Sequence, residues 1–316
     1  MKPMFKKIAI ATAAALALGG AVGSAQAEGE KFILVSHAPD SDSWWNTIKN
    51  GIALAGEQVG AEVEYRNPPT GDIADMARII EQAAASSPDG IITTLADPDV
   101  LSQPIKDAVD AGIPVIIINS GTPEQAADVG ALMYVGQPEY DAGLAAGQRA
   151  KRDGVGSFLC VNHVISNPVV GERCAGFADG LGVDLGSSMI DSGQDPAEIK
   201  NKVIAYLEAN QDTDAILTLG PTSADPIIEA VKEMGLDGDI YFGTFDLGTE
   251  IVKGIKDGVI SWGIDQQPFL QAYLPVIVLA NYHRFGVLPG NNINSGPGFV
   301  TADALGKVEE FAGEYR

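Results

Sequence analysis

From residue 31 onward the sequence repeats one pattern, in which a short apolar run is followed by a polar turn and then by apolar residues at helical spacing. This pattern predicts strands at 33–36, 63–66, 90–95 and 113–118, with helices over 45–58, 73–85 and 100–111. The run at 113–118 is apolar throughout, which is typical of a parallel strand covered on both faces. Alternation of strands and helices predicts a Rossmann-like α/β domain.

A second series of the same kind begins after residue 136. Its strands are expected at 156–161, 188–190, 215–219 and 240–245, and its helices at 140–151, 170–180, 197–209, 223–234 and 249–257. A strand at 259–264, a long helix over 269–285 and a tail at 299–300 remain. The chain has 316 residues, which exceeds the usual size of one compact core, so two α/β domains are expected. No Pro- or Ser-rich linker separates them.

The first 27 residues differ from the rest. Three lysines, at positions 2, 6 and 7, precede an apolar stretch over 8–22, and Ala25-Gln26-Ala27 has the form of a signal-peptidase site. The stretch contains no Cys, so lipid anchoring at this site is not expected. After residue 27 no apolar run is long enough to span a bilayer. We therefore expect a signal peptide over 1–27 and a soluble protein exported to a bacterial periplasm.

Charge and motif content restrict the function classes. The chain has 42 acidic and 20 basic residues, and such a surface repels phosphate backbones, so no nucleic-acid partner is expected. The three His are scattered, and no P-loop, G-x-S-x-G or Cys/His cluster occurs. Asp42 and Asp246 could imitate the paired acids of a glycosidase, but nothing else catalytic accompanies them. A binding protein without metal or cofactor is expected rather than an enzyme.

The two cysteines, Cys160 and Cys174, lie in a predicted strand and in the helix that follows it. A consecutive strand and helix pack together, so a disulfide between them is geometrically reasonable in an oxidising compartment. Two buried free thiols are the alternative.

The turn after the first strand carries the most distinctive side chains. Residues 36–44 hold several short polar groups that could cap a helix, and two adjacent tryptophans, Trp44 and Trp45, end the turn. One interpretation is a core Trp beside a surface Trp, because adjacent residues on a helix point about 100° apart. The other is an aromatic wall against the C–H face of a small polar ligand, with nearby acids binding its hydroxyls.

The order of several short motifs resembles that of the periplasmic sugar-binding proteins of ABC importers, the ribose/galactose-type or type I solute-binding proteins. These motifs are the signal peptide, the strand and turn that end in the aromatic pair and Ile48-Lys49-Asn50-Gly51, and the segments 112–115, 171–177, 243–246 and 264–268. The resemblance extends over essentially the whole mature chain. It implies two Rossmann-like lobes with parallel sheets, joined by crossings near Gly136, Asp265–Gln266 and Ser295. The lobes are then 28–136 with 266–294, and 137–265 with 295–316.

The resemblance also implies the ligand contacts. The expected ligand-binding residues are Ser36, His37, Asp42, Trp44, Trp45, Asn119, Ser120, Asn167, Arg173, Asp195, Asp246 and Gln266. Asn119-Ser120 stands where ribose-type relatives carry Asp-Arg, and Gly220 where they often carry Asn, so the ligand itself stays open. Arg173 is expected to donate a fork of hydrogen bonds to adjacent hydroxyls, with fold stability depending on neither Arg173 nor Asp246. An ion pair is the alternative role for each. His163 follows a strand end and is a further candidate for the cleft.

The function implied is capture of a monosaccharide between two lobes that close around it, and delivery to the permease of an ABC transporter. A polyol, a nucleoside and a furanone-type signal molecule are the alternative ligands, and presentation to a chemotaxis receptor is compatible with the same binding. A transcriptional repressor can share this lobe fold but needs a basic DNA-binding headpiece, which this acidic chain lacks. A monomer is expected.

Overall fold

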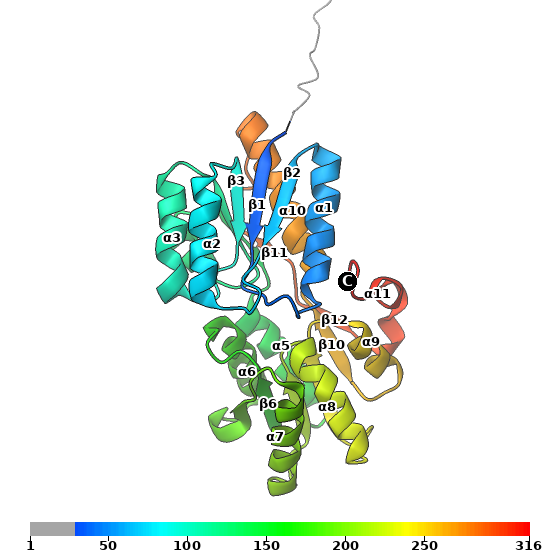
Figure 1. Cartoon of the computed structure of the whole chain (residues 1–316). Coiled ribbons are helices and arrows are strands. Elements are labelled where there is room, and N and C mark those ends of the chain that lie inside the picture. The colour runs from blue at the N-terminus through cyan, green and yellow to red at the C-terminus, as the bar shows by residue number, and fades with distance from the viewer. Residues whose placement is uncertain (1–28) are drawn as a thin grey trace, which may run out of the picture.

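The structure is a computed structural model that describes residues 29–316, so the expected signal peptide lies outside the described residues. The described chain forms two six-stranded sheets with helices on their faces (Figure 1). The strand orders are β11-β5-β4-β3-β1-β2 and β12-β10-β9-β8-β6-β7, and all neighbouring strands are parallel except β10 and β12. The predicted fold class, two Rossmann-like units with mainly parallel sheets, is confirmed.

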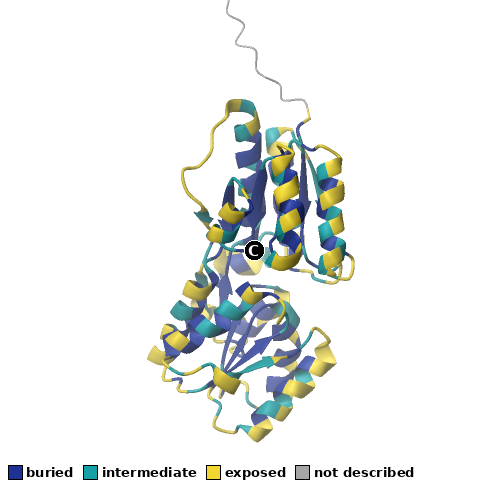
Figure 2. Cartoon of the chain, turned by 90° about the vertical axis from the view of Figure 1, so that its left-hand side faces the viewer, coloured by how far each residue is buried: buried dark blue, intermediate teal, exposed yellow. Residues whose placement is uncertain are grey.

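The first sheet is built from the amino-terminal strands and one late strand. Its strands are β1 (Lys31–Val35), β2 (Glu62–Arg66), β3 (Gly90–Thr93), β4 (Val115–Ile118), β5 (Met133–Gly136) and β11 (Ile293–Asn294); its helices are α1 (Trp45–Val59), α2 (Ile73–Ala85), α3 (Pro98–Asp110), α4 (Pro123–Asp128) and α10 (Pro268–Phe285). The apolar faces of α1 and α10 form one core with the sheet, and those of α2 and α3 form another on the opposite face. Figure 2 shows the buried strands between these partly exposed helices.

The second sheet has the same plan. Its strands are β6 (Phe158–Asn162), β7 (Met189–Asp191), β8 (Ala215–Thr218), β9 (Tyr241–Phe245), β10 (Trp262–Asp265) and β12 (Gly298–Val300); its helices are α5 (Glu139–Arg152), α6 (Pro168–Leu181), α7 (Pro196–Ala209), α8 (Pro221–Glu233), α9 (Thr249–Lys256) and α11 (Gly306–Phe311), with short 3₁₀ turns at Gly186–Ser188 and Ala302–Ala304. Two cores again cover the two faces.

Helices α5 and α6 approach each other unusually closely. A Cβ atom at Gly143 or Gly147 would lie 2.4 Å from the carbonyl oxygen of Arg173 or 2.1 Å from that of Phe177, and Gly176 and Gly180 meet the backbone of α5 in the same way. Only glycine permits this contact, because any side chain would overlap backbone atoms. The contact brings the first turn of α5 beside Arg173 on α6.

The observed elements differ from the predicted ones mainly in short segments. Helix α4 and strands β5 and β11 were not predicted as elements, because runs of two to six residues give too little periodicity to detect. The strand expected at 259–264 begins only at Trp262, since Val259 and Ile260 donate their backbone N–H groups to the Gly254 carbonyl and continue the turn after α9. Within residues 29–316, no helix combines the length and apolar character that crossing a membrane requires.

The chain passes from one sheet to the other three times, at residues 137–138, 266–267 and 295–297. Two of these segments are hydrogen-bonded to each other through Gln267 Nε2 and the Ser295 carbonyl oxygen, 2.6 Å apart. Gly296 allows the third close approach, since a Cβ there would lie 2.4 Å from Gln137 Oε1 and 3.0 Å from Gln266 Cα. The three crossings therefore form one compact connection between the sheets.

Cys160 and Cys174 form a disulfide between β6 and α6, with their Cα atoms 5.9 Å apart and both residues fully buried. The bond closes a loop with a sequence separation of 14 residues, for which the chain-entropy treatment gives about 3 kcal/mol of stabilisation. Reduction should therefore lower the free energy of unfolding by about that amount, as measured by urea unfolding with and without a reducing agent. Coincident unfolding curves, or two titratable thiols in the denatured non-reduced protein, would contradict this.

Candidate functional site

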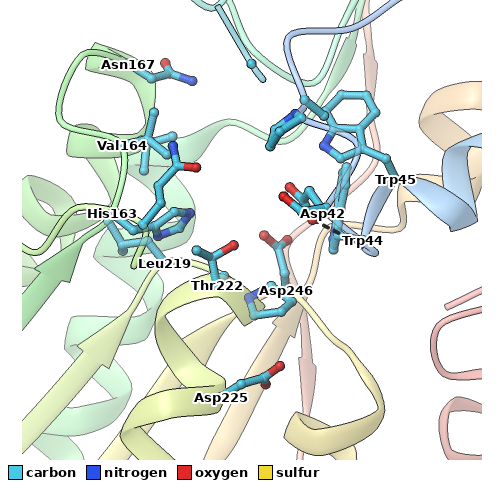
Figure 3. A pocket seen from close by; sticks show the side chains of 18 of the residues that line it. Asp42, Trp44, Trp45, His163, Val164, Asn167, Leu219, Thr222, Asp225 and Asp246 are labelled. Carbon is cyan, nitrogen blue, oxygen red and sulfur yellow. Dashed lines mark hydrogen bonds between the residues drawn. The ribbon is translucent and has the colours of Figure 1, made fainter. Parts of the chain in front are cut away.

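A cavity of about 1070 Å³ lies between the two sheets, where the carboxyl ends of their strands face each other. The residues immediately after β4, β6, β9 and β10 line it: Asn119, His163, Asp246 and Gln266. Ligands bind at this edge of open parallel sheets, because the turns there carry side chains that the sheet does not bury. Figure 3 shows Asp42, Trp44 and Trp45 on one side of the space and His163, Val164 and Asn167 on the other.

On the side of the first sheet, two tryptophans form the wall of the cavity. Trp44 and Trp45 are 8% and 3% exposed, and their rings meet edge to face with centroids 5.2 Å apart. Both line the cavity and both belong to the core beneath α1. The interpretation with one tryptophan on the surface is therefore wrong. Trp44, the N-cap residue of α1, has helical backbone angles (φ −56°, ψ −34°), so the two side chains do diverge, but both directions are buried at this end of the helix.

Asp42 and His37 complete this wall. Asp42 Oδ1 accepts a hydrogen bond from the Trp44 backbone N–H, 3.1 Å away, and burial raises the pKa of its carboxyl group. The ring of His37 lies edge to face with Trp45, and its Nδ1 is 2.9 Å from Thr94 Oγ1. Burial lowers the pKa of His37 to about 4, so the ring is neutral at neutral pH.

A chain of buried amides occupies the base of the cavity next to the crossings. Asn119 has φ 58°, a left-handed conformation that asparagine tolerates better than most residues, and it donates to Gln266 Oε1 and Gln271 Oε1. Asn167 Nδ2 donates to Ser120 Oγ at 3.1 Å, which joins the two sides of the cavity. Asn119, Ser120, Asn167 and Gln266 line the cavity, whereas Gln271 is fully buried behind them.

Arg173 is the most heavily bonded group of the site. Its Nε and Nη2 donate to the two carboxylate oxygens of Glu139, each at 2.7 Å, and its Nη1 donates to the Leu219 carbonyl at 2.8 Å. The same Nη1 lies 3.5 Å from Asp246 Oδ2. Burial acts to lower the pKa of Arg173, but Glu139 and Asp246 raise it above its ordinary value, so the guanidinium remains charged.

The expectation that Arg173 offers a free fork to ligand hydroxyls is therefore wrong, because Glu139 already occupies the fork. The sequence interpretation did not identify Glu139, which stands in the first turn of α5 and looks there like an acid that favours a helix start. The G-x-x-x-G spacings at 143–147 and 176–180 were the available signal, since they bring α5 and α6 together and place Glu139 beside Arg173.

Asp246 is held in a left-handed conformation, φ 65°, at the end of β9. Its Oδ1 accepts from Gln266 Nε2 at 2.5 Å and its Oδ2 faces Arg173. Burial raises the pKa of Asp246 to about 7, although Arg173 and Gln266 favour the charged form. Near neutral pH, a carboxyl group with this pKa changes between a protonated form, which can donate a hydrogen bond, and a carboxylate, which can only accept them.

Two of the predicted site residues do not line the cavity. Ser36 is fully buried, and its hydroxyl is 2.6 Å from Tyr65 OH. Asp195 is exposed and caps α7 by accepting from the Glu198 backbone N–H at 2.9 Å. Its neighbours Gln194 and Pro196 line the cavity instead. The other predicted residues all border it: His37, Asp42, Trp44, Trp45, Asn119, Ser120, Asn167, Arg173, Asp246 and Gln266.

Within the described part of the chain, no three His, Cys, Asp or Glu side chains are grouped so that they could hold a metal ion. The cavity thus combines an aromatic wall, buried carboxylates and side-chain amides. Such a set can bury a flat apolar face and can give and accept several hydrogen bonds.

Comparison with known proteins gives one consistent family. Residues 32–285 match the family described as the periplasmic binding protein domain. A crystal structure of a carbohydrate transporter from Acidothermus cellulolyticus in complex with myo-inositol shares 32% identity, covering 90% of this chain and 99% of that chain, with a TM-score of 0.83. A xylose/arabinose-binding protein of Sulfolobus acidocaldarius is 25% identical over 86% of this chain and 71% of its own length. A D-ribose/D-allose-binding protein of Pseudomonas aeruginosa is 30% identical over 64% and 65%.

Proposed function

The chain belongs to the periplasmic binding protein family, and we propose that it is the solute-binding component of an ABC transporter that captures a small neutral carbohydrate between its two lobes. One observation carries the proposal. The cavity sets two buried tryptophans opposite a buried cluster of carboxylate, guanidinium and amide groups. A monosaccharide has the matching surfaces, because its ring presents apolar C–H faces and a rim of hydroxyls.

The charges at the centre of the cavity support a neutral ligand. Arg173 is already matched by Glu139 and Asp246, and Asp42 adds a further acid. An anionic ligand would therefore meet carboxylates rather than a free cation. Hydroxyls, in contrast, can donate to Asp42 and Asp246 and accept from amide donors such as Asn167, and hydrogen bonds to charged groups are the stronger ones.

The ligand class is a monosaccharide or, as the second candidate, a cyclic polyol. The polyol is favoured by the Acidothermus cellulolyticus protein, whose structure contains myo-inositol. The curated relatives are named for pentoses and for an aldohexose, which favours the monosaccharide. Both candidates present the same kind of hydroxylated ring to the tryptophan wall.

We propose further that the ligand is taken up in the periplasm after removal of residues 1–27, and that a closed, monomeric form meets the permease subunits. The family membership supports a periplasmic site and a transporter partner. A binding role, rather than catalysis, fits a site in which Glu139 and Asp246 are already hydrogen-bonded to Arg173 and Gln266.

A thermal-shift screen of the mature protein against pentoses, hexoses, cyclic polyols and nucleosides tests this function. A ligand present at 100 times its Kd stabilises the protein by about 2.7 kcal/mol, which raises Tm by a few degrees. Shifts confined to hydroxylated rings would support the proposal. No shift from any of these compounds, or conversion of one of them into a product, would contradict it.

Ligand binding should bring the lobes together. We propose that 28–136 with 266–294 form one lobe and 137–265 with 295–316 the other, as the membership of the strands in two sheets supports. The cavity, about 1070 Å³, lies at the upper end of the range for ligand pockets, so closure would be needed to surround a single sugar ring. Small-angle X-ray scattering should show a smaller radius of gyration at saturation. An unchanged radius would contradict closure.

Binding should also release a proton near neutral pH. A ligand hydroxyl that donates to Asp246 favours the carboxylate, so the pKa of this group, about 7 in the free protein, should fall in the complex. Affinity should therefore increase from about pH 5 to about pH 8, because protons compete with the ligand below the free-state pKa. Calorimetric titrations in two buffers with different ionisation enthalpies measure the released proton. Affinity that is independent of pH in this range would show that the ligand does not bind the charged form of Asp246.

A further inference from the structure

His163 lies at the end of β6, on the side of the cavity that faces the tryptophans. In Figure 3 the ring of His163 and the carboxylate of Asp246 both point into the cavity. These two residues come from different strands, and no hydrogen bond joins them. The role of His163 and Asp246 therefore depends on what can occupy the space between them.

Gly220 borders the space between His163 and Asp246. A Cβ atom at this position would lie 3.3 Å from His163 Cε1, 3.7 Å from His163 Nε2 and 3.5 Å from Asp246 Oδ2. Because the residue is glycine, no side chain fills that point. The imidazole nitrogen and the carboxylate oxygen consequently both border the space beside Gly220 that a side chain would otherwise enter.

A contact with Ser223 fixes the orientation of the His163 ring. Its Nδ1 lies 3.2 Å from Ser223 Oγ, and Ser223 Oγ itself accepts from the Leu219 backbone N–H at 3.3 Å. Nε2 is thus the ring nitrogen that remains for the cavity. Burial and the nearby Arg173 lower the pKa of His163 to about 4, so at neutral pH the ring is uncharged and has one donor and one acceptor nitrogen.

We propose that His163 determines specificity in this site by sharing one hydroxyl of the bound carbohydrate with Asp246, in the space that a side chain at position 220 would otherwise enter. The inference rests on the proposed function. The single proton of that hydroxyl is donated to Asp246, and the hydroxyl oxygen accepts from Nε2–H of His163. Nδ1 then accepts from Ser223 Oγ–H, while the Gly220 carbonyl keeps its backbone donors from Ser223 and Ala224.

This arrangement selects for the position and direction of one hydroxyl. A sugar that lacks the hydroxyl, or an epimer that points it elsewhere, leaves both His163 and Asp246 without their ligand partner. Sites that are built to hydrogen-bond a hydroxyl reject analogues without it strongly, because their own buried polar groups are then unpaired.

The experiment uses the best monosaccharide or polyol from the screen and its set of monodeoxy analogues, each titrated into wild type and His163→Phe. Phenylalanine keeps an aromatic ring and removes the nitrogen. We expect the variant to bind the parent about 10- to 100-fold more weakly. For one deoxy analogue only, wild type and His163→Phe should bind with nearly equal affinity. His283→Phe, on the exposed face of α10, is the matched control and should bind like wild type.

Ser223→Ala provides a second variant, since it removes the group that orients the ring and leaves the imidazole in place. It should weaken binding of the parent less than His163→Phe does, with the effect lost for the same analogue. Parent affinity within twofold of wild type in both variants, or equal losses on every analogue, would overturn the role of His163 while leaving carbohydrate binding intact. A wild-type protein that binds none of the compounds would overturn the proposed function and this inference together.

Discussion

Replacing Arg173 by alanine is expected to destabilise the ligand-free protein by about 3–5 kcal/mol and to weaken ligand binding at the same time. Glu139 is only 4% exposed, and both of its carboxylate oxygens are bonded to Arg173. Removing the guanidinium leaves that carboxylate buried without its charged partner, which is the costly way to break an ion pair. Such a loss of stability would contradict the expectation from sequence that fold stability does not depend on Arg173.

A double replacement separates the two effects. Glu139→Gln with Arg173→Met removes both charges and keeps similar volumes, so the free energy of unfolding should return close to the wild-type value while ligand affinity stays low. Lys253→Ala, which breaks the exposed pair with Asp257, is the control and should leave the urea midpoint unchanged. Urea unfolding monitored by circular dichroism measures all four proteins. A wild-type midpoint for Arg173→Ala would refute the structural role of the pair.

Replacing Asp246 by asparagine should also weaken ligand binding strongly, but without loss of stability. Asn tolerates the left-handed conformation at φ 65° and preserves the shape of the side chain, whereas alanine would add backbone strain there. Loss of one partner of a buried charged hydrogen bond costs about 2–5 kcal/mol, which corresponds to roughly 30-fold to several thousand-fold weaker binding.

The stability of this variant follows from the pKa of Asp246. Burial raises the pKa of Asp246 in the folded protein to about 7, above its ordinary value of 3.8, so the folded state binds the proton more tightly than the unfolded chain does. Wild-type stability therefore falls as pH rises from about 4 to about 7, because the carboxyl must ionise inside the protein. Asp246→Asn removes this dependence, and at pH 8 its Tm should equal or exceed that of wild type. A lower Tm together with wild-type affinity would contradict the assignment of Asp246 to the site.

The sequence was sufficient for the architecture because the fold depends on local periodicity. Strands apolar throughout and helices with one apolar face alternate over nearly the whole chain, and helix α2 was predicted at its observed bounds, Ile73–Ala85. Strand β11, with two residues, has no pattern of its own, whereas α4 carries a local start signal, the capping box formed by Thr122 and Gln125, which a search for apolar periodicity does not detect.

Several residues of the candidate site were predictable because a polar residue directly follows a strand, whereas others, such as Asn167 and Arg173, were predicted from the family resemblance. Asn119, Asp246 and Gln266 follow strands directly and line the cavity as expected. Ser36 also follows a strand, yet its hydroxyl points to Tyr65, and no sequence pattern shows which way a short side chain turns. An Asp at this position can either contact a ligand or cap a helix, and in the structure Asp195 caps α7.

Glu139 could not be found in this way because its role depends on a residue 34 positions away in the sequence. The pairing exists only because glycines on α5 and α6 let the two helix backbones meet. The polar network around Arg173 therefore depends on the packing of α5 against α6 and not on a binding motif. Changes in those glycines should disturb the site without touching any cavity residue.

Calorimetric titration of the mature protein shows in one experiment whether the cavity between the lobes binds one neutral carbohydrate, as we claim. We predict a single site per chain with a Kd in the micromolar range, equivalent to about −8 kcal/mol, for the best monosaccharide or cyclic polyol of the screen. In the same titration Asp246→Asn should bind this ligand roughly 30-fold to several thousand-fold more weakly. Absence of binding by the wild-type protein to every hydroxylated ring tested, or equally tight binding by Asp246→Asn, would contradict the claim.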